Sequence, residues 1–201
     1  MTPAPTAPPR MTAAEFWDFC HLPENRSRDF ELIRGEVVEV PRPTKRHGVV
    51  GFRVGKYLDL YAESVGRGYV ATNDSGVLLD EDPDTVVGPD MAYYQDAATF
   101  DDLHPKWGED VPVLAVEVMS PNDKPNRVNA KVADYLASGV KLVWLVDHED
   151  RQVAVYRSGQ NHVMVREGGE LTGDDVLPGL SVRVADLFKL PGERPAVGAS
   201  A

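Results

Sequence analysis

The sequence predicts a single α/β domain built on a mixed β-sheet that is flanked by helices, and three observations support this prediction. The chain has 201 residues, of which 42% are hydrophobic and 26% charged, as in one globular domain with a substantial core. Helical and strand-like segments follow the order helix, hairpin, helix, several strands, helix, strands. The run from Val113 to Met119 is apolar at six of its seven positions, as in a central strand covered on both faces.

Capping and turn residues mark the elements of the N-terminal half. The first helix is expected to begin at Thr12, where the pattern Thr-x-x-Glu forms a capping box ahead of an apolar cluster. Strands are expected over 29–33 and 36–40, and the intervening Arg34-Gly35 is typical of a tight hairpin. Apolar residues at helical spacing then predict a second helix within 43–64.

Strand-like runs dominate the second half of the chain. They lie over 76–79, 86–94, 111–119, 141–147, 152–157 and 162–167. A third helix is expected from about Pro125 to Ser138, because the following Gly139 most easily takes the left-handed conformation found after a helix end. A turn over 158–161 joins the last two strands.

The composition predicts a soluble, cytoplasmic protein with one domain over residues 11–190. Residues 1–10 and 191–201 have the composition of a disordered extension and a flexible tail. Cys20 is the only cysteine, so an internal disulfide and a Cys-x-x-Cys metal site are both impossible, which favours a reducing compartment. The chain has no signal-peptide core and no run near the roughly 20 apolar residues that cross a bilayer, so no membrane partner is expected.

The charge is unevenly distributed along the chain. The formal net charge of −11 disfavours a protein that coats nucleic acid, because phosphate binding uses Lys and Arg. Residues 74–110 hold eleven acids against the single base Lys106, a net of −10. Five bases and no acid lie within 41–58, namely Arg42, Lys45, Arg46, Arg53 and Lys56. The overall charge is therefore weak evidence against a nucleic-acid substrate.

Three charged residues occur where apolar residues are expected. Glu117 interrupts the apolar central strand, where a buried carboxylate is costly unless a cation or several donors meet it. Asp90 lies between two apolar runs, and Lys131 shares a helical stripe with Val128 and Tyr135. Each position alone is more often an exposed strand end or a structural ion pair. Two acids and one base together favour a site, although ion-pair networks also produce such clusters.

A series of short motifs follows one another along the chain. They are Glu31-Leu32-Ile33 with Gly35-Glu36, His47, Pro89-Asp90, Glu117-Val118 with Ser120-Pro121, Lys131, Tyr135, Gly139-Val140, Trp144-Leu145-Val146-Asp147 and Val155-Tyr156. In kind and order they resemble the Uma-two family, a bacterial group of restriction-endonuclease-like domains in the PD-(D/E)XK nuclease superfamily. The similarity covers roughly residues 11–187. It implies a restriction-endonuclease-like core with flanking helices and an N-terminal hairpin.

One position departs from the pattern of the wider superfamily. That pattern places a lysine two residues after the second acid, where this chain has Met119. The resemblance implies that the lysine has moved to the following helix as Lys131, which the helical stripe selects independently. Lys124 is the second choice, because it precedes Pro125 in a loop.

The resemblance implies a Mg²⁺-dependent endonuclease that hydrolyses phosphodiester bonds of DNA. Asp90 and Glu117 would hold the ion, for which Mn²⁺ could substitute, because carboxylates are hard donors and no His/Cys set selects zinc. Lys131 would assist the attacking water or the transition state. Glu36 is a further candidate metal ligand, and Glu31 can take its place.

The basic segment supplies the candidate contacts with nucleic acid. The candidate residues are His47, Lys45, Arg46 and Arg53, with Arg127 as a further base. Such a charge run is usually a solvated helix face, and a lone histidine there is usually a cap or a surface residue. The choice between DNA and RNA stays open. A homodimer is a candidate assembly, because nucleases that cut both strands often pair subunits.

Two other functions stay open. Met119 and the acidic segment 74–110 also fit a nuclease fold that is kept as a non-catalytic module for binding nucleic acid or protein. Paired carboxylates also fit a hydrolase of another bond, such as a glycosidase, which needs two carboxylates roughly 5–9.5 Å apart and no essential metal.

Overall fold

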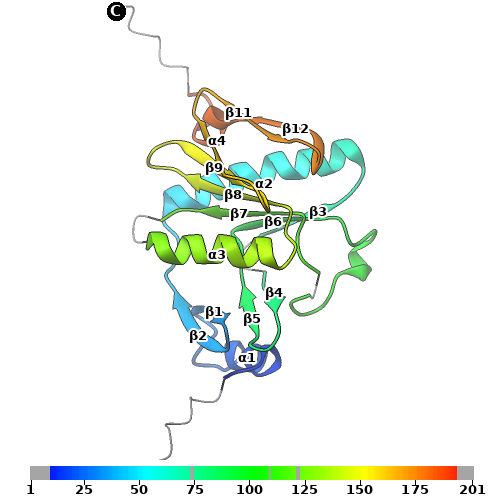
Figure 1. The fold of residues 1–201 in the computed structure, drawn as a ribbon, viewed down its shortest axis with the longest axis vertical. Helices are drawn as coiled ribbons and strands as arrows, with labels where there is room; N and C mark the ends of the chain where they lie inside the picture. Colours follow the sequence, from blue (N-terminus) through cyan, green and yellow to red (C-terminus); the bar gives the residue numbers. More distant parts are fainter. Residues whose placement is uncertain (1–9, 73–74, 109, 121–122, 194–201) are drawn as a thin grey trace, which may run out of the picture.

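The computed structural model describes residues 10–72, 75–108, 110–120 and 123–193 (Figure 1). The helices are α1 (Ala13–Cys20), α2 (Lys45–Val65), α3 (Pro125–Ala137), α4 (Val184–Leu187) and the 3-10 helix η1 (Phe100–Asp102). The strands are β1 (Asp29–Ile33), β2 (Glu36–Val40), β3 (Tyr69–Thr72), β4 (Val77–Asp80), β5 (Thr85–Val87), β6 (Met91–Tyr94), β7 (Leu114–Val118), β8 (Leu142–Asp147), β9 (Gln152–Tyr156), β10 (Val163–Arg166), β11 (Glu170–Gly173) and β12 (Leu177–Arg183). The predicted extension and tail fall, apart from residue 10 and residues 191–193, outside the described residues.

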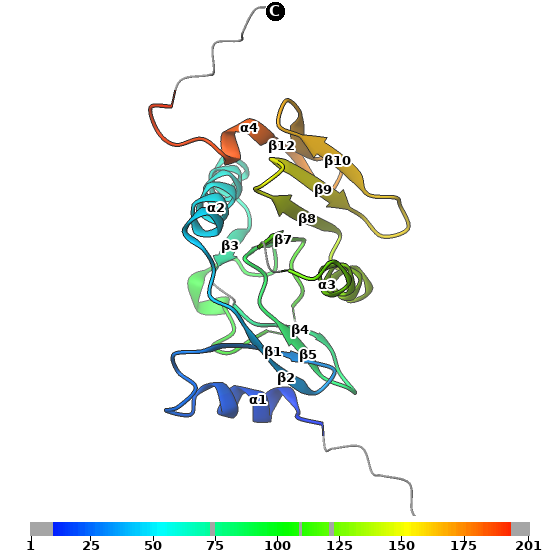
Figure 2. The same ribbon diagram turned by 90° about the vertical axis from the view of Figure 1, so that its left-hand side faces the viewer.

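A six-stranded mixed sheet forms the main layer, in the order β10-β9-β8-β7-β6-β3. Strand β7 pairs parallel with β8 and antiparallel with β6. Helix α2 covers one face of this sheet and α3 the other, as Figure 2 shows edge-on. Alternate residues of β7 reach the two sides, since Val116 packs in the core with α2 and Ala115 packs with Val132 of α3. The mixed sheet and its doubly covered central strand are therefore confirmed.

A smaller antiparallel sheet lies beside the main layer, in the order β2-β1-β5-β4 (Figure 2). Its hairpin turns at Arg34 and Gly35, which both have positive φ as a tight turn requires. Helix α1 packs on this sheet through Phe16, which is buried against Leu32 and Val86. Thr12 forms the predicted capping box of this helix with Glu15.

The prediction of one strand over 86–94 is wrong, because the segment divides between the two sheets. Strand β5 pairs with β1 and β4 in the small sheet, whereas β6 pairs with β3 and β7 in the main one. Pro89 lies at the break, and proline has no N–H to donate to a strand ladder. The division places Asp90 at the junction of the two sheets.

The C-terminal hairpin of β11 and β12, with α4, forms a third layer over α2 that was not predicted (Figure 1). Leu171, Leu177 and Leu187 are fully buried and extend the core on the α2 side of the main sheet. Strand β3 at the edge of the main sheet was also missed. Within the described residues, no helix is long and apolar enough to span a bilayer.

Candidate functional site

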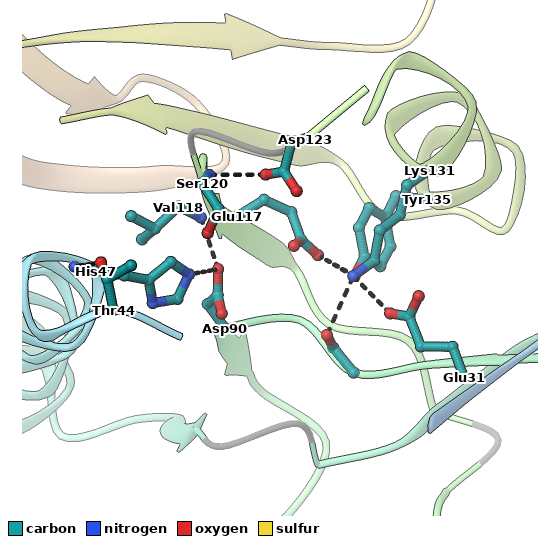
Figure 3. A network of polar contacts seen from close by, with 11 residues as sticks. Glu31, Thr44, His47, Asp90, Glu117, Val118, Ser120, Asp123, Lys131 and Tyr135 are labelled. Carbon is teal, nitrogen blue, oxygen red and sulfur yellow. Dashed lines mark hydrogen bonds and ion pairs between the residues drawn. The ribbon is translucent and has the colours of Figure 1, made fainter. Parts of the chain in front are cut away.

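A cavity of about 310 Å³ lies where the two sheets meet, and we call it the junction cavity. Its lining includes Glu31 of β1, His47 of α2, Asp90 before β6, Glu117 of β7 and Lys131 of α3. Figure 3 shows these side chains converging from five separate segments. The three residues singled out by their apolar surroundings are therefore brought together by the fold.

Lys131 lies at the centre of the polar network in this cavity. Its Nζ atom is 2.9 Å from Oε1 of Glu117 and 2.7 Å from Oε1 of Glu31, and it donates a hydrogen bond of 3.2 Å to the carbonyl of Gly88 (Figure 3). Burial opposes its charge, but the attraction of Glu117 and Glu31 outweighs burial and raises the pKa of Lys131. Lys131 is therefore a protonated donor over the neutral pH range.

Glu117 is held on β7 with little access to solvent. Its side chain is 15% exposed, and its Oε1 accepts a 2.6 Å hydrogen bond from the hydroxyl of Tyr135. Burial raises the pKa of Glu117 to about 7, and the nearby charge of Asp90 adds to this rise. Lys131 and the Tyr135 hydroxyl act in the opposite direction without cancelling the effect. A bound cation would stabilise the charged form of this carboxylate.

Asp90 is fixed by two donors on one of its oxygens. Its Oδ2 accepts a 2.6 Å hydrogen bond from the backbone N–H of Val118 and lies 3.1 Å from Nε2 of His47 (Figure 3). Thr44 caps α2 by accepting a hydrogen bond from the backbone of His47, which orients the first turn of the helix. Burial lowers the pKa of His47, but the contact with Asp90 and the charges of Glu117 and Asp123 together outweigh burial, so the net shift is upward.

The donor set fits a magnesium ion held by two carboxylates. Among the described residues, no three His, Cys, Asp or Glu side chains lie close enough together to hold a metal by themselves. Glu117 accepts its hydrogen bond on Oε1 and Asp90 accepts its own on Oδ2, so Oε2 and Oδ1 accept no hydrogen bond within the described part of the chain. Magnesium commonly uses one or two carboxylates and keeps several waters. Asp90 and Glu117 therefore have a suitable oxygen each.

Of the two glutamates left open as a further metal ligand, Glu31 lines the junction cavity. The side chain of Glu31 is 6% exposed and contacts Lys131 inside the cavity. Glu36 is exposed at the start of β2, the edge strand of the small sheet, and does not line the junction cavity.

Of the residues predicted to contact nucleic acid, only one lines the junction cavity. His47 lines it, whereas Lys45, Arg46 and Arg53 do not. Arg46 is exposed and lies 3.2 Å from Glu149. Their contact with nucleic acid stays a prediction.

Two cations that the sequence ranked lower do line the cavity. They are Lys124 and Arg127, the latter 3.4 Å from Oε2 of Glu31. Asp123 also lines the cavity, and the sequence analysis did not single it out. Its carboxylate accepts a 2.7 Å hydrogen bond from the backbone N–H of Ser120. An acid three residues after a serine at a strand end is a common loop pattern, so it gave no distinct signal.

Comparisons with known proteins support the fold and the family. A family model named Uma2, described as "Putative restriction endonuclease", matches residues 16–185. A solved structure from Anabaena variabilis, described as a putative nuclease belonging to DUF820, superposes with a TM-score of 0.72 at 18% sequence identity. That match covers 89% of this chain and 97% of the other, and at this identity it shows a shared fold. No protein with a curated description matches the chain.

The family model spans most of the chain, from α1 to α4, and so includes all five residues of the junction cavity named above. The chain belongs to the Uma2 family of restriction-endonuclease-like proteins.

Proposed function

We propose that this protein is a metal-dependent endonuclease that hydrolyses phosphodiester bonds of DNA. The observation that carries the proposal is the pair of carboxylates Asp90 and Glu117 beside a protonated lysine in a cavity open to solvent. Burial is costly for Glu117, and such costs are typical of sites that bind a cation. The family description supports the same reaction class.

The residues divide the catalytic roles among themselves. Asp90 and Glu117 would hold Mg²⁺, or Mn²⁺ in its place, through their carboxylates. The ion would supply Lewis-acid stabilisation of the phosphate and a more acidic water. Because its pKa is raised, Lys131 acts as a donor that orients the nucleophile or stabilises developing negative charge, and not as a base. His47 and Tyr135 position Asp90 and Glu117 respectively.

A cleavage assay tests the proposal directly. Purified protein is expected to cut supercoiled plasmid DNA and single-stranded circular DNA only when Mg²⁺ or Mn²⁺ is present, and EDTA is expected to stop the reaction. Asp90→Ala, purified in the same way, reports contaminating nuclease and is expected to cut no faster than a blank. Equal cutting by both proteins would refute the assignment. Metal binding without cleavage of any DNA would favour the non-catalytic binding module.

Metal affinity is expected to depend on pH through Glu117. A carboxylate ligand binds a cation in its deprotonated form, and the pKa of Glu117 is about 7. The apparent affinity for Mn²⁺ should therefore fall by up to about tenfold for each pH unit below 7 and level off above about pH 8. Calorimetric titration across this range measures it. An affinity that is constant over the same range would show that Glu117 is not a ligand.

A further inference from the structure

We propose that a groove along α2 binds one unpaired nucleobase beside the cleaved phosphodiester, so that the preferred substrate is single-stranded or locally unpaired DNA. The groove has a volume of about 620 Å³, and we call it the α2 groove. Its lining includes Gly48, Phe52 and Lys56 of α2, Thr72 of β3 and Met91 of β6. The inference rests on the proposed function, because it places the groove next to a nuclease site.

The α2 groove is continuous with the junction cavity. Both are lined by Pro43, His47 and Asp90. A phosphodiester bound at Asp90 would therefore lie at one end of the groove. The nucleoside attached to that phosphate would then lie in the groove. A groove of several hundred cubic ångströms is in the size range of small-molecule pockets and is large enough for a base.

The glycines of α2 keep the floor of this groove low. Gly51 and Gly55 are explained by packing, because an added Cβ would lie 2.8 Å from Cε and 3.1 Å from Sδ of Met91 respectively. Gly48 is different, since an added Cβ would meet nothing within 4 Å. Glycine lowers helix stability relative to alanine, and no neighbouring atom requires a glycine at position 48. Space for a bound group in the groove would explain why a glycine is present there.

Phe52 supplies a flat apolar surface at the edge of the groove. Phe52 is 69% exposed, so its ring is accessible for stacking on a base. Phe52 follows His47 by five residues, or about 7.5 Å along the helix axis. Aromatic side chains bind single strands by stacking on base faces, and they do so with little sequence preference.

Charge at the far end of the groove limits its occupant to about one nucleotide. Lys56 lies one turn beyond Phe52 and can meet a phosphate, whereas Asp59 lies further along the groove and repels one. A base face is available for stacking only when the base is unstacked or unpaired. The groove therefore fits a single strand better than an intact duplex, which also suits a chain with a net charge of −11.

Binding of fluorescent oligothymidylate, compared with a fluorescent duplex, tests the proposal when Ca²⁺ replaces Mg²⁺ to prevent cutting. Wild-type protein is expected to bind the single strand more tightly. Phe52→Ala removes the stacking surface, and Gly48→Leu fills the groove at a position where the backbone tolerates a side chain. Each is expected to weaken single-strand binding by about 5- to 150-fold. Phe100→Ala is the matched control, because Phe100 is 85% exposed and lines neither cavity.

Two further measurements separate the groove from the site. Mn²⁺ affinity is expected to stay at the wild-type value in Phe52→Ala and Gly48→Leu, which would show that His47 and Asp90 are undisturbed. Thermal stability should not fall in either variant, and it should rise slightly in Gly48→Leu, because leucine favours a helix more than glycine does. Wild-type cleavage together with unchanged oligonucleotide binding by both variants would overturn the groove and leave the nuclease proposal intact. So would tighter binding of the duplex, or a change from dimer to monomer in Phe52→Ala without loss of affinity, since Phe52 would then join two copies of the chain.

Discussion

Replacing Lys131 with methionine is expected to lower the free energy of unfolding by about 3–5 kcal/mol, the usual cost of removing one partner from a buried ion pair. Lys131 contacts both Glu31 and Glu117, whose side chains are 6% and 15% exposed. Without the ammonium group, the two nearly buried carboxylates lose the positive charge that lies between them. Methionine is an unbranched apolar side chain one atom shorter than lysine, so the variant removes the charge and keeps most of the packing.

The destabilisation by Lys131→Met is expected to grow with pH. In the variant, the pKa of Glu117 should lie even further above its ordinary value. A carboxyl whose pKa is raised by folding favours the folded state at low pH and loses that contribution as pH rises through the raised pKa. Urea unfolding at about pH 5 and pH 8 should therefore show the smaller loss at pH 5.

Lys141→Met is the matched control for this experiment, because Lys141 is exposed immediately before β8. Its unfolding free energy should change by no more than about 0.5 kcal/mol. A similarly small change for Lys131→Met at both pH values would mean that the carboxylates do not depend on the lysine. The network drawn in Figure 3 would then not describe the protein in solution.

The charged residues of the site could be predicted where a strong apolar pattern surrounds them. Glu117 stands out because the other four residues of β7 are apolar and buried between two helices. Glu31 carries the same signal, since Phe30 and Leu32 flank it in β1, whereas Glu36 directly follows the hairpin turn. Comparing the neighbours of the two acids would have favoured Glu31 from the sequence.

The sheet arrangement could not be predicted from local pattern. The two halves of 86–94 are equally apolar, and only their pairing partners show that β5 and β6 belong to different sheets. Helix α2 illustrates the same limit, because its periodicity defines a basic face but not what that face meets. Arg46 contacts Glu149, more than a hundred residues away, while His47 turns inward to Asp90.

Replacing Glu117 with glutamine is expected to reduce metal-dependent cleavage by about 10³-fold, which corresponds to roughly 4 kcal/mol of transition-state stabilisation. The amide has the shape of the carboxylate but lacks the charge that a divalent ion requires. Its oxygen can still accept hydrogen bonds from Tyr135 and Lys131, so the fold should remain intact. Cleavage rates and Mn²⁺ titration of the variant measure the loss, and Glu63→Gln on the exposed surface of α2 is the matched control.

The stability of Glu117→Gln distinguishes a functional site from a structural ion pair. A neutral amide removes the cost of burying the carboxylate, and Lys131 keeps Glu31 as its partner. The unfolding free energy is therefore expected to stay within about 1 kcal/mol of the wild-type value while activity is lost, as at sites where function opposes stability. A loss of about 3 kcal/mol or more, with cleavage retained, would contradict the proposed role. Glu117 and Lys131 would then form a structural pair, and the metal site would have to lie elsewhere in the fold.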